Sequence, residues 1–261
     1  MPTAANLYYY VHEAENYARP PVILIHGAGG THLHWPPEIR RLSNQRVFAL
    51  DLPGHGKSVG VGKQSVTDYT QNVIDFMHCL GLSAAVIVGH SMGGAIALTL
   101  ALKHPKCVLG LGLVATGARL RVAPAILDST ANPGNFSMAI QVITDWAFGS
   151  QASPNLKELA AQRMTEIRPT VLHGDFLACD RFDVLDKLDQ LQIPTAIICG
   201  TEDKLTPPRY SEYLRAHIPT ARLHMIEAAG HMVMLEKPDR VANTLAAFLN
   251  KISTRPVKQS P

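Results

Sequence analysis

Ser91 stands at the centre of the pentapeptide Gly89-His90-Ser91-Met92-Gly93, which constrains the fold more than any other feature of the chain. The apolar run 84–88 before it predicts a short buried strand, and the apolar run 94–102 after it predicts a buried helix. A serine on the sharp turn between such elements usually has a sparsely allowed backbone conformation, and glycines two positions away on each side keep neighbouring side chains clear. The turn exposes the hydroxyl and directs the helix N-terminus at it, which predicts a nucleophilic serine.

Further motifs follow other strand-like runs. They are Val22-Ile23-Leu24-Ile25-His26-Gly27-Ala28-Gly29-Gly30, Asp51-Leu52-Pro53-Gly54-His55-Gly56-Lys57-Ser58, Gly200-Thr201-Glu202-Asp203-Lys204-Leu205-Thr206-Pro207 and Ala229-Gly230-His231. In this order, and together with the Ser91 pentapeptide, they resemble the oxyanion loop, the turn after the next strand, the acid loop and the base loop of the α/β-hydrolase superfamily. The resemblance covers nearly the whole chain and is strongest to the capped carboxylesterases, enol-lactonases and C–C bond hydrolases.

The pattern of apolar runs predicts an α/β fold. Continuous apolar strands alternate with helical patterns, which favours a mostly parallel sheet covered by helices on both faces. The expected strands are 7–12, 22–25, 47–50, 85–88, 108–114, 195–199 and 223–226, and the expected helices outside the insertion are 67–80, 92–103, 208–217 and 238–250. Because little chain precedes the first expected strand, the sheet has seven or eight strands.

The alternation of strands and helices breaks between residues 117 and 190. Helical patterns occupy 136–148, 155–167 and 170–179, separated by prolines, and the family resemblance implies a helical cap at this place. We therefore expect an α/β-hydrolase core at 1–116 and 191–252, a helical cap at 117–190, and a flexible tail at 253–261. A chain of 261 residues is long enough for one such core with an insertion.

A catalytic triad of Ser91, Asp203 and His231 is predicted from the order of the motifs. A serine hydroxyl needs a base, and the base needs an orienting acid. His231 follows the last expected strand, whereas His26 and His90 lie at positions better suited to shaping their loops by hydrogen bonding. Glu202 is the neighbouring alternative to Asp203, and the G-x-x-D register favours Asp203.

Two backbone N–H groups are expected to stabilise the oxyanion of the tetrahedral intermediate. Met92 supplies one at the start of its helix, and the loop after residue 25 supplies the other, from Ala28 or alternatively from Gly29. Each such donor typically contributes about 3 kcal/mol in the transition state. Candidate substrate-binding residues are Gly29, Trp146, Phe148 and Leu205, and the alternative for the two aromatic residues is packing of the cap onto the core.

No cofactor or metal is expected. Gly56-Lys57-Ser58 lacks the first glycine of a phosphate-binding loop, and His32 occupies the third glycine position of a dinucleotide fingerprint. A net charge of +3 without a basic aromatic run argues against nucleic acid. The absence of a signal-like or membrane-length apolar segment predicts a cytoplasmic protein that does not bind membranes, as a monomer or small homo-oligomer.

The predicted function is that of a serine hydrolase that acts on a small-molecule ester, thioester or lactone through an acyl-enzyme. The alternatives with the same triad are a C–C bond hydrolase, a lyase, and a cofactor-free haloperoxidase or perhydrolase. Hydrolase-like folds also serve as small-molecule receptors, but every predicted catalytic position is filled here. Ser91 argues against the relatives that use an aspartate nucleophile, namely haloalkane dehalogenases and epoxide hydrolases.

Overall fold

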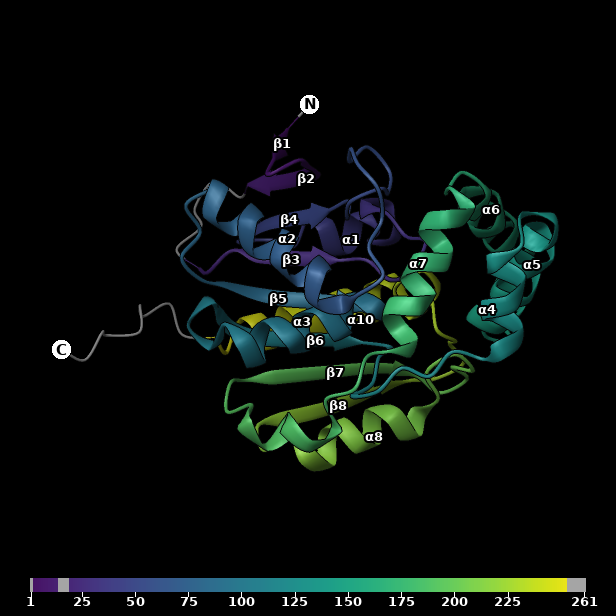
Figure 1. Ribbon diagram of the computed structural model, residues 1–261. Helices are drawn as coiled ribbons and strands as arrows, with labels where there is room; N and C mark the ends of the chain where they lie inside the picture. Colours follow the sequence, from purple (N-terminus) through teal and green to yellow (C-terminus); the bar gives the residue numbers. More distant parts are fainter. Residues whose placement is uncertain (1, 14–18, 253–261) are drawn as a thin grey trace.

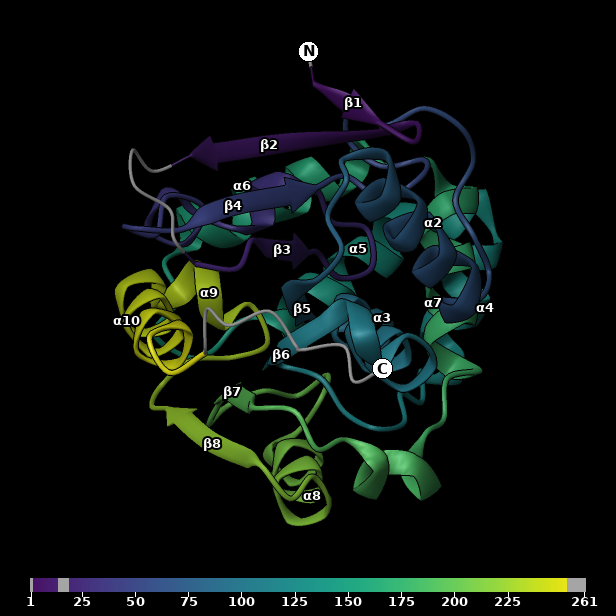
Figure 2. The same cartoon turned by 90° about the vertical axis from the view of Figure 1, so that its left-hand side faces the viewer.

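The central feature of the computed structural model, which describes residues 2–13 and 19–252, is an eight-stranded sheet with the order β1-β2-β4-β3-β5-β6-β7-β8 (Figures 1 and 2). The strands are β1 (Thr3–Ala4), β2 (Leu7–Glu13), β3 (Val22–Ile25), β4 (Arg46–Leu50), β5 (Ala85–His90), β6 (Val108–Val114), β7 (Thr195–Gly200) and β8 (Ala221–Ile226). Strand β2 pairs antiparallel with both β1 and β4 at one edge, and the remaining pairings are parallel.

The mostly parallel α/β sheet expected from the sequence is thus confirmed, with eight strands. The eighth strand is the two-residue β1, which pairs with the start of β2. The six strands β3 to β8 run in one direction, so their carboxyl ends meet at one edge of the sheet. Ser91, Asp203 and His231 each lie in a loop that follows one of these ends, which places the chemistry-bearing residues at the same edge.

Helices cover both faces of the sheet because the strand side chains are apolar on both sides. The helices outside the insertion are α1 (Pro37–Arg40), α2 (Val66–Cys79), α3 (Met92–Lys103), α8 (Pro208–His217), α9 (Val233–Glu236) and α10 (Pro238–Leu249). One apolar cluster joins α2, α3 and α8 to one face, and a second joins α1, α9 and α10 to the other. Helix α3 is buried along nearly its whole length, so the residues around Ser91 rest on a closely packed support.

Four helices stand between β6 and β7, where the sequence predicts three. They are α4 (Pro124–Ala131), α5 (Phe136–Ala147), α6 (Pro154–Thr165) and α7 (Pro169–Asp180), and we call them the insertion helices. Helix α4, which the sequence pattern does not predict, packs with Ile126 against α5 and α7 in a small apolar cluster. The insertion helices lie together beyond the carboxyl ends of the strands, at the right of Figure 1.

The chain enters and leaves the insertion helices through two segments that run side by side. Arg119 and Asp183 form an antiparallel bridge, and the N–H of Val184 donates to the carbonyl of Ala118 at 2.8 Å. This pairing lies close to the boundaries predicted for the cap, although the division into domains stays a prediction. The predicted tail 253–261 lies outside the described residues.

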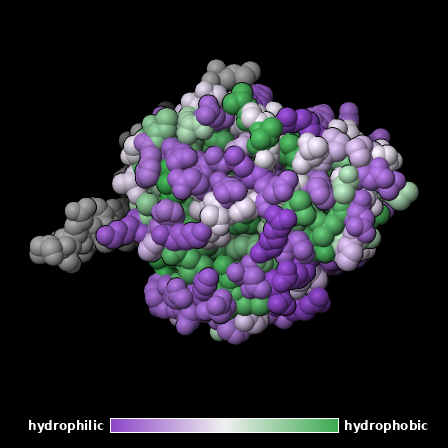
Figure 3. Space-filling model, in the orientation of Figure 1, coloured by the Kyte–Doolittle hydropathy of each residue, from purple (hydrophilic) through white to green (hydrophobic). Residues whose placement is uncertain are grey.

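The surface drawn in Figure 3 is mostly hydrophilic, with the apolar residues in separate patches. In the described part of the chain, none of the helices combines the length and the apolarity that crossing a bilayer requires.

Candidate active site

Ser91 occupies the turn between β5 and α3 with φ 53° and ψ −116°. This backbone conformation belongs to the left-handed side of φ space, which residues with a Cβ rarely adopt. Neighbouring groups hold it in place: the Ser91 N–H donates to the carbonyl of Val114 at 3.0 Å, and the Thr116 hydroxyl donates to the Ser91 carbonyl at 2.8 Å. The end of β6 and the residues that follow it therefore hold the strained turn in place.

Gly89 and Gly93 permit the turn because no other residue fits at either position. A Cβ on Gly89 would lie 2.1 Å from the carbonyl oxygen of Gly93, and a Cβ on Gly93 would lie 2.2 Å from that of Ile25. Both obstacles are backbone atoms, which cannot move aside as a flexible side chain can. The two glycines are thus required by the close approach of the start of α3 to β5 and β3.

Asp203 and His231 form a buried pair at the ends of β7 and β8. The Nδ1 atom of His231 lies 3.1 and 3.0 Å from the two carboxylate oxygens of Asp203. The Asp203 carboxylate also accepts the N–H groups of Leu205 and Thr206 at 2.9 and 2.8 Å, and the Thr206 hydroxyl at 2.8 Å. These donors orient the carboxylate, which in turn directs Nε2 of His231 away from Asp203.

Glu202, the sequence alternative to Asp203, is engaged elsewhere. Its carboxylate accepts the N–H of Ser150 at 2.6 Å and the Ser150 hydroxyl at 2.9 Å. These hydrogen bonds lower the pKa of Glu202. The geometry therefore gives the position beside His231 to Asp203, in the register that the sequence favours.

His26 and His90 hold loops together through hydrogen bonds. Nε2 of His26 accepts the N–H of Leu52 at 3.0 Å, so its Nδ1, 2.7 Å from the Gly27 carbonyl, carries the proton. Nε2 of His90 donates to the carbonyl of His231 at 3.0 Å. Burial lowers the pKa of both His26 and His90 well below the ordinary value, so both remain neutral at physiological pH.

The loop that carries His231 is attached to the segment after α5. The N–H of Met232 donates to the carbonyl of Ala147 at 3.0 Å, and the Glu236 carboxylate accepts the N–H groups of Gly149 and Gly230, each at 2.9 Å. Burial raises the pKa of Glu236, although the two N–H donors oppose that shift. The end of α5 and the base loop therefore form one connected unit.

The two expected oxyanion donors are the N–H groups of Met92, which follows Ser91, and of Ala28, in the loop after β3. Met92 is the first residue of α3, so its N–H has no partner within the helix. The N–H of Ala28 makes no hydrogen bond with any described residue, and Ala28 lines the cavity that contains Ser91. The alternative donor, Gly29, is not available, because its N–H donates to the carboxylate of Asp175 at 2.8 Å.

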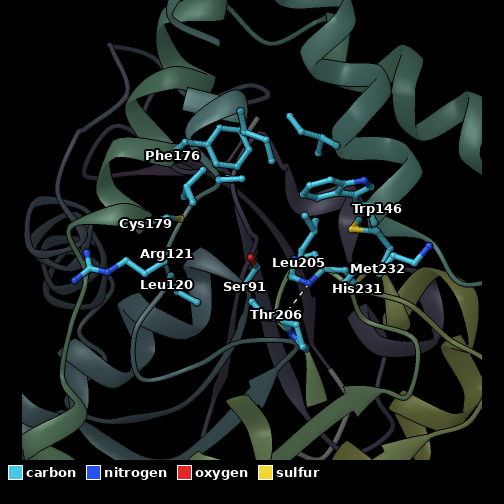
Figure 4. A pocket seen from close by; sticks show the side chains of 18 of the residues that line it. Ser91, Leu120, Arg121, Trp146, Phe176, Cys179, Leu205, Thr206, His231 and Met232 are labelled. Atoms are coloured by element: carbon cyan, nitrogen blue, oxygen red, sulfur yellow. Dashed lines mark hydrogen bonds between the residues drawn. The ribbon is translucent and has the colours of Figure 1, made fainter. Parts of the chain in front are cut away.

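A cavity of about 350 Å³ lies between the carboxyl ends of the strands and the insertion helices. Figure 4 shows the Ser91 hydroxyl at its base beside Leu205 and His231, with Phe176 and Trp146 on the opposite wall. The Ser91 hydroxyl and His231 both line the cavity, without a hydrogen bond between them among the described residues. Such contacts are often loose before substrate binds.

The cavity wall is apolar around Ser91 and basic at its exposed part. Its exposed charged residues are Arg121, Lys204 and Arg209, and the described wall contains no aspartate or glutamate. The charge of Arg121 is partly balanced by Asp183, because a guanidinium nitrogen of Arg121 lies 3.9 Å from a carboxylate oxygen of Asp183. The electrostatic environment of the cavity therefore favours neutral or anionic ligands over cations.

Two of the four candidate substrate-binding residues line the cavity and two do not. Trp146, which is 41% exposed, and Leu205 belong to its wall. Contrary to the expectation, Phe148 does not line the cavity. It is only 3% exposed and packs in the core cluster that also contains Ala229, which is the alternative that the sequence left open. The expectation for Gly29 is corrected as well. This residue lies outside the cavity wall and faces α7, where its nearest side chain is Leu172.

Thr206 and Asp175 are site residues that the sequence reasoning does not single out. The threonine lies three positions after the acid, a spacing that could have indicated a side-chain donor to Asp203. Asp175 lies in a helix far along the chain from the loop it contacts, and no local motif marks it. Among the described residues there is no cluster of His, Cys, Asp and Glu suited to a metal ion.

Comparison with known proteins identifies the family of the fold. Residues 20–238 match the family model described as the alpha/beta hydrolase fold. The chain is 29% identical to a pimeloyl-[acyl-carrier protein] methyl ester esterase of Neisseria meningitidis serogroup C, over 88% of this chain and 94% of the relative. It is 25% identical to 3-oxoadipate enol-lactonase 1 of Acinetobacter baylyi, over 89% and 90% of the two chains. A solved thermophilic esterase superposes with a TM-score of 0.80 at 35% identity, covering 95% of this chain and 99% of that one.

Proposed function

Because this chain belongs to the α/β-hydrolase fold family and is a hydrolase of that fold, we propose that it cleaves small esters, thioesters or lactones with a triad of Ser91, His231 and Asp203. The single observation that carries the proposal is the buried Asp203–His231 pair, which directs Nε2 of the imidazole toward the cavity that contains the strained Ser91. The printed names of the relatives, esterases and an enol-lactonase, support the same reaction class.

In the proposed mechanism, the Ser91 hydroxyl attacks the substrate carbonyl while Nε2 of His231 takes its proton. Asp203 holds the tautomer of His231 and stabilises the imidazolium that forms. The N–H groups of Ala28 and Met92 donate to the oxyanion. His231 then protonates the leaving group. In the second half, the same imidazole takes a proton from a water molecule that attacks the acyl carbonyl, and it returns this proton to the Ser91 oxygen as the acid leaves.

The cavity supports small substrates because its wall is apolar around Ser91 and insertion helices border it. An acyl group gains binding energy only where its apolar surface leaves water, and a cavity of about 350 Å³ accepts a compact group. Short acyl esters and small lactones are therefore the proposed substrate class, in preference to long-chain lipids.

The test is hydrolysis of p-nitrophenyl acetate by the wild-type protein and by Ser91→Ala, with a folding control by circular dichroism. The triad acts as a unit, so the substitution should lower kcat by about 10⁴-fold or more. His231→Ala should have a comparable effect, whereas His26→Asn should retain more activity in whatever fraction folds. Retention of most activity in purified Ser91→Ala would exclude the triad.

A further inference from the structure

Asp175 is a buried carboxylate that the proposed catalytic steps do not use. It lies in α7 of the insertion helices, and its side chain is fully shielded from solvent. A carboxylate in such a place is costly unless donors satisfy it. Asp175 lies beside the proposed oxyanion hole, because it contacts the loop that contains Ala28.

Three donors from three parts of the core converge on Asp175. Its Oδ2 accepts the N–H of Gly29 and Nε2–H of His55, each at 2.8 Å, and its Oδ1 accepts the hydroxyl of Tyr69 at 2.5 Å. Gly29 belongs to the loop after β3, His55 to the loop after β4, and Tyr69 to α2. One carboxylate of the insertion helices thus ties together core segments that are distant in sequence.

The contacts of His55 favour its protonated form, which pairs with the Asp175 carboxylate. Nδ1 of His55 lies 3.1 Å from the carbonyl of Pro53, while Nε2 lies 2.8 Å from Asp175. Both neighbours are acceptors, so the surroundings of His55 favour a ring that carries a proton on each nitrogen. Burial disfavours this charge, but the attraction and hydrogen bond of Asp175 outweigh it and raise the pKa of His55.

The Gly29 N–H lies one residue beyond Ala28, the proposed oxyanion donor. Gly29 has φ 62°, and the N–H of Gly30 closes a turn onto the carbonyl of Gly27 at 3.1 Å. On the other side, the ring of His26 donates to that same carbonyl at 2.7 Å. The peptide groups before and after Ala28 are thus both anchored, the first through Gly27 and the second through Asp175.

We propose that Asp175 is a positioning residue: by accepting the Gly29 N–H, it holds the Ala28 N–H in the direction required to bind the oxyanion. This inference rests on the proposed serine hydrolase function. It assigns to a residue of the insertion helices a part in transition-state stabilisation, although Asp175 touches neither the substrate nor Ser91. The insertion helices thus do more than bound the substrate cavity.

A positioning role and a purely structural role predict different kinetics. A misdirected donor weakens binding of the tetrahedral oxyanion and leaves binding of the planar substrate nearly unchanged, so kcat falls while KM does not. A purely structural role lowers stability without this split. Inhibitors give the same distinction. Ser91 adds to a short trifluoromethyl ketone and forms a tetrahedral oxyanion, whereas the corresponding methyl ketone binds as the planar carbonyl, so the ratio of the two affinities measures stabilisation of the oxyanion.

The experiment compares Asp175→Ala and Asp175→Asn with the wild type, using p-nitrophenyl acetate and the two ketones. We expect Asp175→Ala to lower kcat by about 10- to 100-fold, a part of the loss for a deleted oxyanion donor, with KM within about 3-fold. Its affinity for the trifluoromethyl ketone should fall by a similar factor. Asp175→Asn keeps an oxygen that can accept the Gly29 N–H and should recover most of kcat.

Val73→Ala is the matched stability control, because Val73 is a buried apolar residue one turn after Tyr69 in α2 and is not one of the donors to the carboxylate. It should lower the Tm without changing the ketone ratio. If Asp175→Ala does not fold, Asp175→Glu, which keeps the charge but displaces the carboxylate by one methylene, should show the same split. A kcat within about 3-fold of the wild type in the folded variant, or a loss no different from that of Val73→Ala, would overturn the proposal. Full activity of Ser91→Ala would instead overturn the proposed triad on which this inference rests.

Discussion

Replacing Ser91 by glycine should stabilise the protein relative to replacing it by alanine. Both variants lack the hydroxyl, so they differ only in the Cβ. At φ 53° and ψ −116°, the backbone has the conformation of the first central residue of a type II′ turn, where glycine dominates. Alanine keeps the strain of wild-type Ser91, and glycine removes it.

The size of the effect follows from two opposing contributions. A residue held in such a region costs about 1–3 kcal/mol, whereas glycine costs about 0.4–1 kcal/mol through the greater freedom of the unfolded chain. The net gain of Ser91→Gly over Ser91→Ala is then about 1 kcal/mol. For a chain of this size, this corresponds to a Tm higher by about 2–4 °C.

The measurement is thermal and urea denaturation of the two variants, followed by far-ultraviolet circular dichroism. Ser83 provides the control pair, because it is exposed and is not one of the residues with a positive φ. There, the glycine variant should be less stable than the alanine variant by about 0.4–1 kcal/mol. The reasoning is refuted if glycine is destabilising at both positions by the same amount, since Ser91 would then store no strain.

Three further predictions concern the substrate and the buried pair. In a p-nitrophenyl ester series, kcat/KM should peak at short acyl chains and fall by the dodecanoate, because the cavity is small; a profile still rising there would contradict the cavity argument. At low ionic strength, an ester with a terminal carboxylate should have a lower KM than its neutral analogue of equal length, and salt or the double variant Lys204→Gln/Arg209→Gln should remove the difference. Equal KM values would show that the basic residues at the exposed wall do not contact substrate. The pKa of folded His55 is raised, so the stability that its pairing with Asp175 contributes is complete below the unfolded pKa of about 6.5 and is lost as pH rises through the folded pKa. The difference in unfolding free energy between wild type and Asp175→Asn should therefore be larger at about pH 6 than at about pH 9, and a difference that grows with pH would contradict the ion pair.

The sequence predicts those parts of the site whose geometry is local. The Ser91 turn follows from its two glycines, a buried strand and a buried helix, and the expectation that Asp203 rather than Glu202 faces His231 follows from register within one short loop. These relations span few residues, so the pattern of the chain is sufficient to infer them. The confirmed sheet likewise follows from continuous apolar runs.

The parts that the sequence does not predict depend on contacts between distant segments. Trp146 and Phe148 are both aromatic and two residues apart, yet only the structure shows that the first belongs to the cavity wall and the second to the core. Helix α4 is only eight residues long, so its apolar pattern is too short to predict a helix, and Ile126 packs it against α5 and α7. Asp175 is one of many acidic residues until its helix is placed against Gly29.

The hydrogen bond from Gly29 to Asp175 has a consequence for the engineering of this scaffold. One way to change the substrate range of such a protein is to replace its insertion helices with those of a relative, joined at the paired segments around Arg119 and Asp183. Here, a graft that omits an acceptor at the Asp175 position would leave the His55 ring and the Gly29 N–H buried without their acceptor, beneath a new recognition surface. Such chimeras should therefore have a lower kcat as well as a different selectivity, unless the grafted helix carries a carboxylate at the position of Asp175.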